Sequence, residues 1–177
     1  GALAAALGTM VANLSAHKRG WDERWAFFSD WAARGQHLKT QLLRLVDEDT
    51  QAFNAILAAF RLPKGTDAEK NMRKKAIQDA TRYAIEVPYQ TMEAAFQTFE
   101  LLKIMAQEGN PNSASDAAVG ALCARAAVHG ALLNVQTNVS ALDDKEFAND
   151  MLQKALKMAL QADVLEQEIV AIARGKM

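Results

Sequence analysis

The chain has 177 residues, half of them hydrophobic, which is enough for one globular domain with a sizeable core. Its 20 basic and 21 acidic residues nearly cancel, so neither nucleic acid nor an anionic membrane is an expected partner. A single cysteine excludes an internal disulfide framework and favours a reducing, cytoplasmic location, and the three histidines lack the spacing of a zinc site.

Five helices are expected, because few glycines and prolines interrupt the chain and its apolar residues recur at helical spacing. Their approximate ranges are 1–16, 22–62, 66–107, 113–139 and 143–175. The first is shorter than the ~20 residues that cross a bilayer. Pro88 lies inside the third, where its missing N–H predicts a bend.

The last three helices each begin with the spacing of a capping box, in which two side chains satisfy free backbone N–H groups. The pairs are Thr66 with Glu69, Ser113 with Asp116, and Asp143 with Glu146. These caps separate long helices by short loops, which indicates an antiparallel bundle. The sequence therefore predicts one all-α domain over residues 1–177.

The fourth expected helix is rich in alanine, and Arg125 is its only charged residue between Ala117 and Val135. A helix with almost no polar face is either central in its bundle or covered by another subunit. We therefore expect this helix to be buried and the protein to form a homodimer.

Asp49, on the second expected helix, is the candidate catalytic residue. It interrupts a stripe of apolar residues with helical spacing, made of Leu38, Leu42, Leu45, Phe53, Ile56 and Phe60. Helical phase predicts that Asp49 is buried on this stripe and that Asp47 faces water. Burial would raise the pKa of the Asp49 carboxyl, which suits a general acid or base. From periodicity alone, a structural hydrogen-bonding role for Asp49 is slightly favoured.

Polar residues gather at both ends of the fourth helix. Asn110, Ser115 and Asp116 lie at its positive end, where a carbonyl-bearing or anionic ligand could bind, although helix capping alone also explains such residues. Asn134 and Asn138 are amides on its apolar part, and core hydrogen bonds explain them as well as a ligand does. Asp116 and Asn134 are about 27 Å apart along the helix axis. Both could therefore reach one small ligand only if the helix pairs antiparallel with its copy.

Five groups of residues carry a family resemblance. In chain order they are LVDEDTQAF at 45–53, RLPKGT at 61–66 with Glu69, Lys70 and Arg73, Val87-Pro88, Gly109-Asn110 with Ser115-Asp116, and Asn134-Val135 with Asn138. Together they resemble the formimidoyltetrahydrofolate cyclodeaminase and methenyltetrahydrofolate cyclohydrolase family, and they cover essentially the whole chain.

The resemblance implies a helical homodimer that closes 5-formimidoyltetrahydrofolate to 5,10-methenyltetrahydrofolate with release of ammonia, as in histidine degradation and folate one-carbon metabolism. It places the catalytic aspartate in the 47–49 run, where helical phase selects Asp49. The residues implied at the pterin and amidine are Asn110, Ser115, Asp116, Asn134 and Asn138. Those implied at the folate glutamate tail are Lys64 and Arg73, with Lys18 or Arg19 as further candidates.

The resemblance also implies a folate substrate, with or without a polyglutamate tail, and no separate cofactor or metal. A formimidoyltransferase, fused or separate, is an expected partner. The family carries a glycine-rich segment ending in serine ahead of its first helix, and this chain is expected to begin after that segment. The alternatives are methenyltetrahydrofolate cyclohydrolase activity and a non-catalytic helical dimerisation module.

Overall fold

The computed structural model describes residues 1–176, and that part of the chain contains five α-helices and no strand. The helices are α1 (Ala2–Ala16), α2 (Trp25–Arg61), α3 (Asp67–Glu108), α4 (Ala114–Val139) and α5 (Lys145–Arg174). Short 3-10 turns, Asp22–Arg24 and Pro111–Ser113, precede α2 and α4. The expected all-α fold is confirmed.

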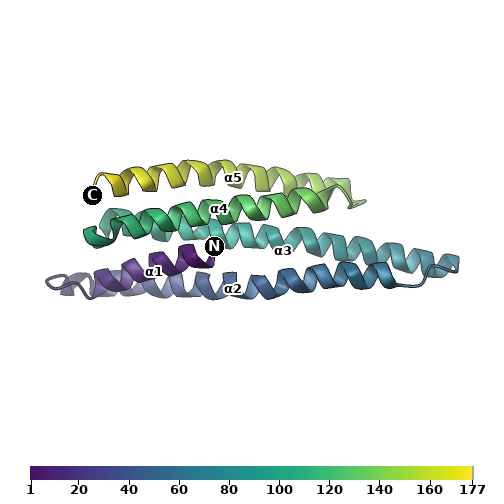
Figure 1. Ribbon diagram of the computed structural model, residues 1–177, viewed down its shortest axis with the longest axis horizontal. Coiled ribbons are helices and arrows are strands. Elements are labelled where there is room, and N and C mark those ends of the chain that lie inside the picture. The colour runs from purple at the N-terminus through teal and green to yellow at the C-terminus, as the bar shows by residue number, and fades with distance from the viewer. Residues whose placement is uncertain (177) are drawn as a thin grey trace.

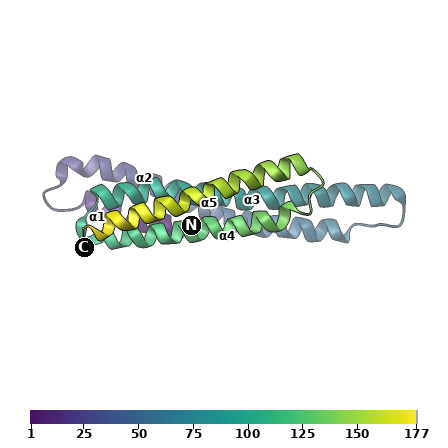
Figure 2. The ribbon, with the colours of Figure 1, turned by 90° about the horizontal axis from the view of Figure 1, so that it is seen from above.

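Successive helices run in opposite directions along one long bundle (Figure 1). The α2–α3 hairpin reaches beyond the turn between α4 and α5, which both views show (Figures 1 and 2). α1 is the shortest helix and lies beside only one half of α2 (Figure 1). The far half of α2 is consequently covered mainly by α3.

α4 packs against α1, α3 and α5, which confirms its central position. Its small residues allow this packing: a Cβ at Gly120 would collide with the Leu102 side chain of α3. Together with its 3-10 turn, α4 is long and apolar enough to cross a bilayer by length and composition. One side of α4 remains exposed, however, including Val119, Leu122 and Leu133.

The helix starts agree only partly with the predicted capping boxes. Thr66 and Glu69 form the expected box at the start of α3. The box predicted at Ser113 is wrong: that residue caps α4 without a side-chain hydrogen bond, because the preceding 3-10 turn leads directly into the helix. The cap predicted at Asp143 is also wrong, since the adjacent Asp144 accepts the hydrogen bond from the Phe147 N–H.

Candidate functional site

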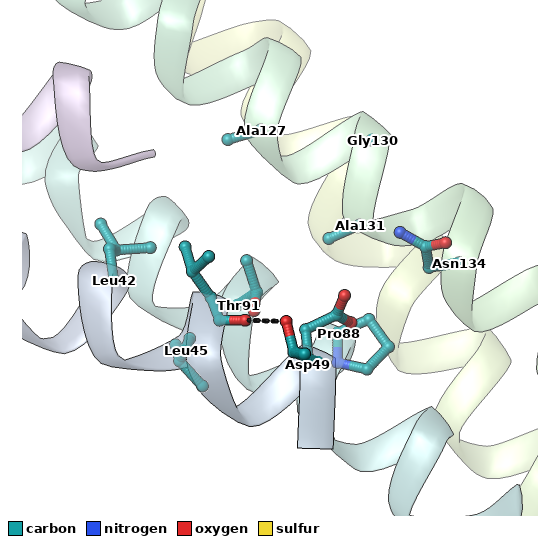
Figure 3. Close-up of a pocket in the computed structure, with 11 residues that line it drawn as sticks. Leu42, Leu45, Asp49, Pro88, Thr91, Ala127, Gly130, Ala131 and Asn134 are labelled. Carbon is teal, nitrogen blue, oxygen red and sulfur yellow. Dashed lines mark hydrogen bonds between the residues drawn. The ribbon is translucent and has the colours of Figure 1, made fainter. Parts of the chain in front are cut away.

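A cavity of about 360 Å³ opens on the bundle between α2, α3 and α4. It is lined by Leu42, Leu45, Val46, Asp49 and Thr50 of α2, Pro88 and Thr91 of α3, and Ala127, Gly130, Ala131 and Asn134 of α4 (Figure 3). We call this cavity the Asp49 hollow. Its volume is near the lower end of the range for small-molecule sites.

The hollow exists because α1 fills the space between α2 and α4 over only part of their length. α1 packs against both helices, and Gly1, just before its first turn, lies against Leu42. Beyond that point α2 and α4 continue with α3 beneath them. Small residues of α4, including Gly130 and Ala131, leave further room on that wall.

Asp49 lies in the wall of the hollow formed by α2 (Figure 3). The prediction that it is buried is wrong, because the structure leaves its side chain exposed, so burial does not support Asp49 as the general acid or base. The predicted stripe fails beyond this point too: Phe53 and Phe60 are 60% and 53% exposed, since little besides α3 covers that half of α2. Asp47 is also exposed but does not line the hollow.

Asn134 lies on the α4 wall, facing Asp49 across the hollow (Figure 3). Its expected burial is likewise wrong, because its side chain is exposed. The structure therefore brings together a carboxylate, which can accept or return a proton, and an amide, which can donate and accept hydrogen bonds. These are the only predicted site residues that share this hollow within residues 1–176.

Asn138 is half-buried one turn beyond Asn134, and its amide nitrogen is engaged within the protein. Its Nδ2 donates to the Ala84 carbonyl oxygen of α3 at 2.9 Å and to the Asn134 carbonyl oxygen at 3.0 Å. A substrate contact through this nitrogen would have to replace one of these hydrogen bonds, because both of its hydrogens already have acceptors.

Asn110, Ser115 and Asp116 lie at the opposite end of α4, far from the hollow in the same chain. The side-chain oxygen of Asn110 accepts from the Asn112 N–H, and its own N–H donates to Ser15 Oγ at 2.8 Å. Ser115 is exposed and Asp116 is half-buried. Within one subunit the rise of the helix keeps Asp116 about 27 Å from Asn134, as expected.

The predicted tail-binding residues lie at the two ends of the molecule. Lys64 and Arg73 line a cavity of about 320 Å³ at the tip of the α2–α3 hairpin, with Lys70 and Lys74. The Arg73 guanidinium donates to the Phe60 carbonyl oxygen. Lys18 and Arg19 lie in the α1–α2 connection at the other end of the bundle (Figure 1). One substrate tail cannot reach both groups in a single chain.

Among the lining residues that were not predicted as site residues are Thr50, Pro88 and Thr91. Thr50 follows Asp49 directly, and Thr91 follows Pro88 by nearly one helical turn. The signal that could have identified Pro88 and Thr91 is the proline itself, because a proline inside a long helix marks a local irregularity that α3 must accommodate.

Within residues 1–176, no group of three or more histidine, cysteine, aspartate or glutamate side chains is arranged to hold a metal ion. The expectation that the protein works without a metal or cofactor stays a prediction.

Comparisons with known proteins agree over most of the chain. A family model described as formiminotransferase-cyclodeaminase matches residues 1–157, which include every residue of the hollow. The chain is 34% identical over 177 residues to a methenyltetrahydrofolate cyclohydrolase of Methylorubrum extorquens, covering all of this chain and 85% of the relative.

Longer relatives match over a smaller share of their length. The chain is 32% identical to the formimidoyltransferase-cyclodeaminase of Gallus gallus and 35% identical to that of Rattus norvegicus. These matches cover 90% and 82% of this chain but only 30% and 27% of the two relatives.

A solved structure shares the fold. The crystal structure of formiminotetrahydrofolate cyclodeaminase from Thermotoga maritima superposes with a TM-score of 0.85 at 24% identity, covering 98% of this chain and 83% of that one.

Proposed function

The chain belongs to the formiminotransferase-cyclodeaminase family, and we propose that it converts 5-formimidoyltetrahydrofolate to 5,10-methenyltetrahydrofolate and ammonia in the Asp49 hollow. The observation that carries the proposal is the single carboxylate of Asp49 facing the Asn134 amide across a cavity that lies wholly within the matched residues.

One carboxylate is sufficient for the proton transfers of this reaction. Folate N10 attacks the carbon of the protonated formimidoyl group and forms a tetrahedral intermediate in which that carbon carries N5, N10 and an NH2 group. Asp49 accepts the proton from N10 and returns it to the departing nitrogen, so that the C–N bond breaks and ammonia leaves. The remaining N5–C–N10 bridge is the methenyl product. Asn134 is placed to hydrogen-bond the amidine or the pterin.

The size of the hollow suits the reacting end of a folate rather than the whole molecule. Its walls are mostly apolar apart from Asp49, Thr50, Thr91 and Asn134, as expected for a site that holds a flat heterocycle. α2 continues for 12 residues after Asp49, which is a length of about 18 Å. The basic cavity with Lys64 and Arg73 lies beyond this end of α2. We assign that cavity to the glutamate tail, with or without further glutamates.

The second part of the proposal is a homodimer in which the site draws on both subunits. The exposed side of α4 is apolar, and an antiparallel pairing of two α4 helices across a two-fold axis would cover it. That pairing would bring Ser115 and Asp116 of the partner subunit toward Asn134. Asn110 of the partner subunit would follow at the same end of α4.

Methenyltetrahydrofolate cyclohydrolase activity is a second candidate, favoured by the Methylorubrum extorquens relative, most of whose length this chain spans. The same carboxylate would then activate water against the methenyl carbon, and the exposure of Asp49 admits water to the hollow.

The two reactions are separated by comparing substrates. We expect ammonia release from 5-formimidoyltetrahydrofolate to be faster, in kcat/KM, than hydrolysis of 5,10-methenyltetrahydrofolate. Hydrolysis alone would establish the cyclohydrolase instead. A non-catalytic dimerisation module would show neither reaction and no rise in melting temperature with either folate.

The remaining expectations stay predictions: a cytoplasmic location, a role in histidine degradation, and a fused or separate formimidoyltransferase partner. The vertebrate relatives, which carry both enzyme names, support the formimidoyltransferase partner.

A further inference from the structure

The proline in α3 leaves one backbone carbonyl without its helical donor. In an α-helix the N–H of residue 88 would donate to the carbonyl of residue 84, and Pro88 has no N–H. Ala84 and Pro88 are both buried, so water cannot easily replace the missing donor. The Asn138 amide of α4 supplies it, with Nδ2 2.9 Å from the Ala84 oxygen.

The Asn138 amide also makes a hydrogen bond to a residue that lines the hollow. Its second hydrogen is directed to the Asn134 carbonyl oxygen on α4, 3.0 Å away. Both acceptors are carbonyl oxygens, which fixes the orientation of the amide because only its nitrogen can donate. Pro88 and Asn134 themselves line the hollow on the α3 and α4 walls.

We propose that Asn138 is a positioning residue, which fills the hydrogen bond broken by Pro88 and thereby fixes α4, with Asn134, at a set distance from the Pro88 wall beside Asp49. The proposal rests on the function assigned to the Asp49 hollow. It explains why a polar side chain occurs at the half-buried position 138.

A double-mutant cycle tests the pairing without reference to activity. Asn138→Ala leaves the Ala84 carbonyl unpaired and is expected to lower the folding equilibrium constant by roughly 5- to 30-fold, measured by urea denaturation. Pro88→Ala restores an N–H at position 88, which can donate to that carbonyl. In this background Asn138→Ala is expected to change the equilibrium constant by about twofold or less.

Gln136→Ala is the matched control, since Gln136 is an exposed amide on the same helix. It should have the same small effect in both backgrounds. Equal losses for Asn138→Ala with and without Pro88 would overturn the pairing.

Steady-state kinetics separate positioning from substrate binding. A loosened wall misplaces Asn134 relative to Asp49, so Asn138→Ala is expected to lower kcat on the order of tenfold with KM nearly unchanged. Adding Pro88→Ala should recover part of that lost kcat. A raised KM that persists in the Pro88→Ala background would show direct substrate contact and refute the positioning role.

Failure of the proposed function gives a different result. If the wild-type protein turned over neither folate, the proposed function and the catalytic consequence would both be refuted. The stability cycle would still decide whether Asn138 and Pro88 are coupled.

Discussion

Asp163 on α5 accepts hydrogen bonds from two side chains of α4. Its Oδ1 is 2.8 Å from His129 Nε2 and also receives the Arg125 Nε–H. The hydrogen bond from His129, followed by that from Arg125, lowers the pKa of the Asp163 carboxyl below its ordinary value of 3.8. Glu166 is the other acidic group beside Arg125. The ionised Asp163 carboxylate therefore links α5 to α4 through these two hydrogen bonds.

A depressed pKa in the folded state predicts how stability depends on pH. The ionised Asp163 stabilises the fold above pH 3.8, its ordinary value, and this contribution is lost as the pH falls through the lower pKa of the folded protein. Asp163→Asn is thus expected to lower the urea midpoint at pH 7, and the difference from wild type should shrink toward pH 3.

The control for this prediction is Asp79→Asn, at an exposed aspartate of α3, which should change the midpoint little at either pH. A deficit in Asp163→Asn that is constant from pH 7 to pH 3 would show that the ionised carboxylate contributes nothing specific.

Asp49 shows how far a single residue can be interpreted from its sequence context. Its helical phase places it beside Leu42 and Leu45 in the wall of the hollow, as the period of α2 predicts. Its exposure was not predictable, because burial depends on which other helix covers that turn. In this fold α1 covers only part of α2, and no local pattern reports where that cover ends.

Helix boundaries were largely predictable because their signals are local. The Thr66–Glu69 capping box determines where α3 starts, and both of its hydrogen bonds form. At α5 the predicted cap was one residue early, since the Asp143 carboxylate instead pairs with Lys74 and the Asp143 N–H donates to Gln78 Oε1. Two neighbouring aspartates have the same capping preference, and only tertiary contacts decide between them.

The exposed apolar side of α4 supports the proposed dimer. Val119, Leu122, Ala126 and Leu133 recur at helical spacing on this side, and Leu133 is 65% exposed. Arg125 and His129, which reach toward α5, mark its edge. An apolar strip of this kind along the central helix is a surface that a second copy would cover.

Charges placed on this strip should separate the subunits. We expect the wild type to sediment as a dimer at micromolar concentration and the double variant Leu122→Glu, Leu133→Glu to sediment as a monomer, because buried unpaired carboxylates are costly. Folate turnover should fall with the dimer, since Ser115 and Asp116 of the partner subunit would leave the site.

Leu160→Glu provides the control, because Leu160 is 69% exposed but lies on α5. It should remain dimeric. A wild type that is monomeric and fully active at low concentration would refute both the dimer and the shared site.

At the scale of the whole molecule, five antiparallel helices of unequal length create the site. Toward the hairpin that joins them, the long α2 and α3 extend first past the start of α1 and then past the turn between α4 and α5 (Figure 1). Because α1 is short, the Asp49 hollow stays open beyond its start. Because the hairpin projects past the α4–α5 turn, the basic cavity of Lys64 and Arg73 lies on its tip. The order of helices was predictable from periodicity, whereas these offsets arise only from their packing.

Substitution of the two nearby aspartates tests whether Asp49 transfers the protons. Asp49→Asn and Asp47→Asn each remove one exposed carboxylate from α2, but only Asp49 lines the hollow. With both variants folded like the wild type, we measure methenyltetrahydrofolate formation and ammonia release from 5-formimidoyltetrahydrofolate. Asp49→Asn is expected to lower kcat by about 100-fold or more, and Asp47→Asn is expected to stay within about threefold of wild type. Near-normal turnover by Asp49→Asn, or loss of turnover in Asp47→Asn instead, would contradict this role of Asp49.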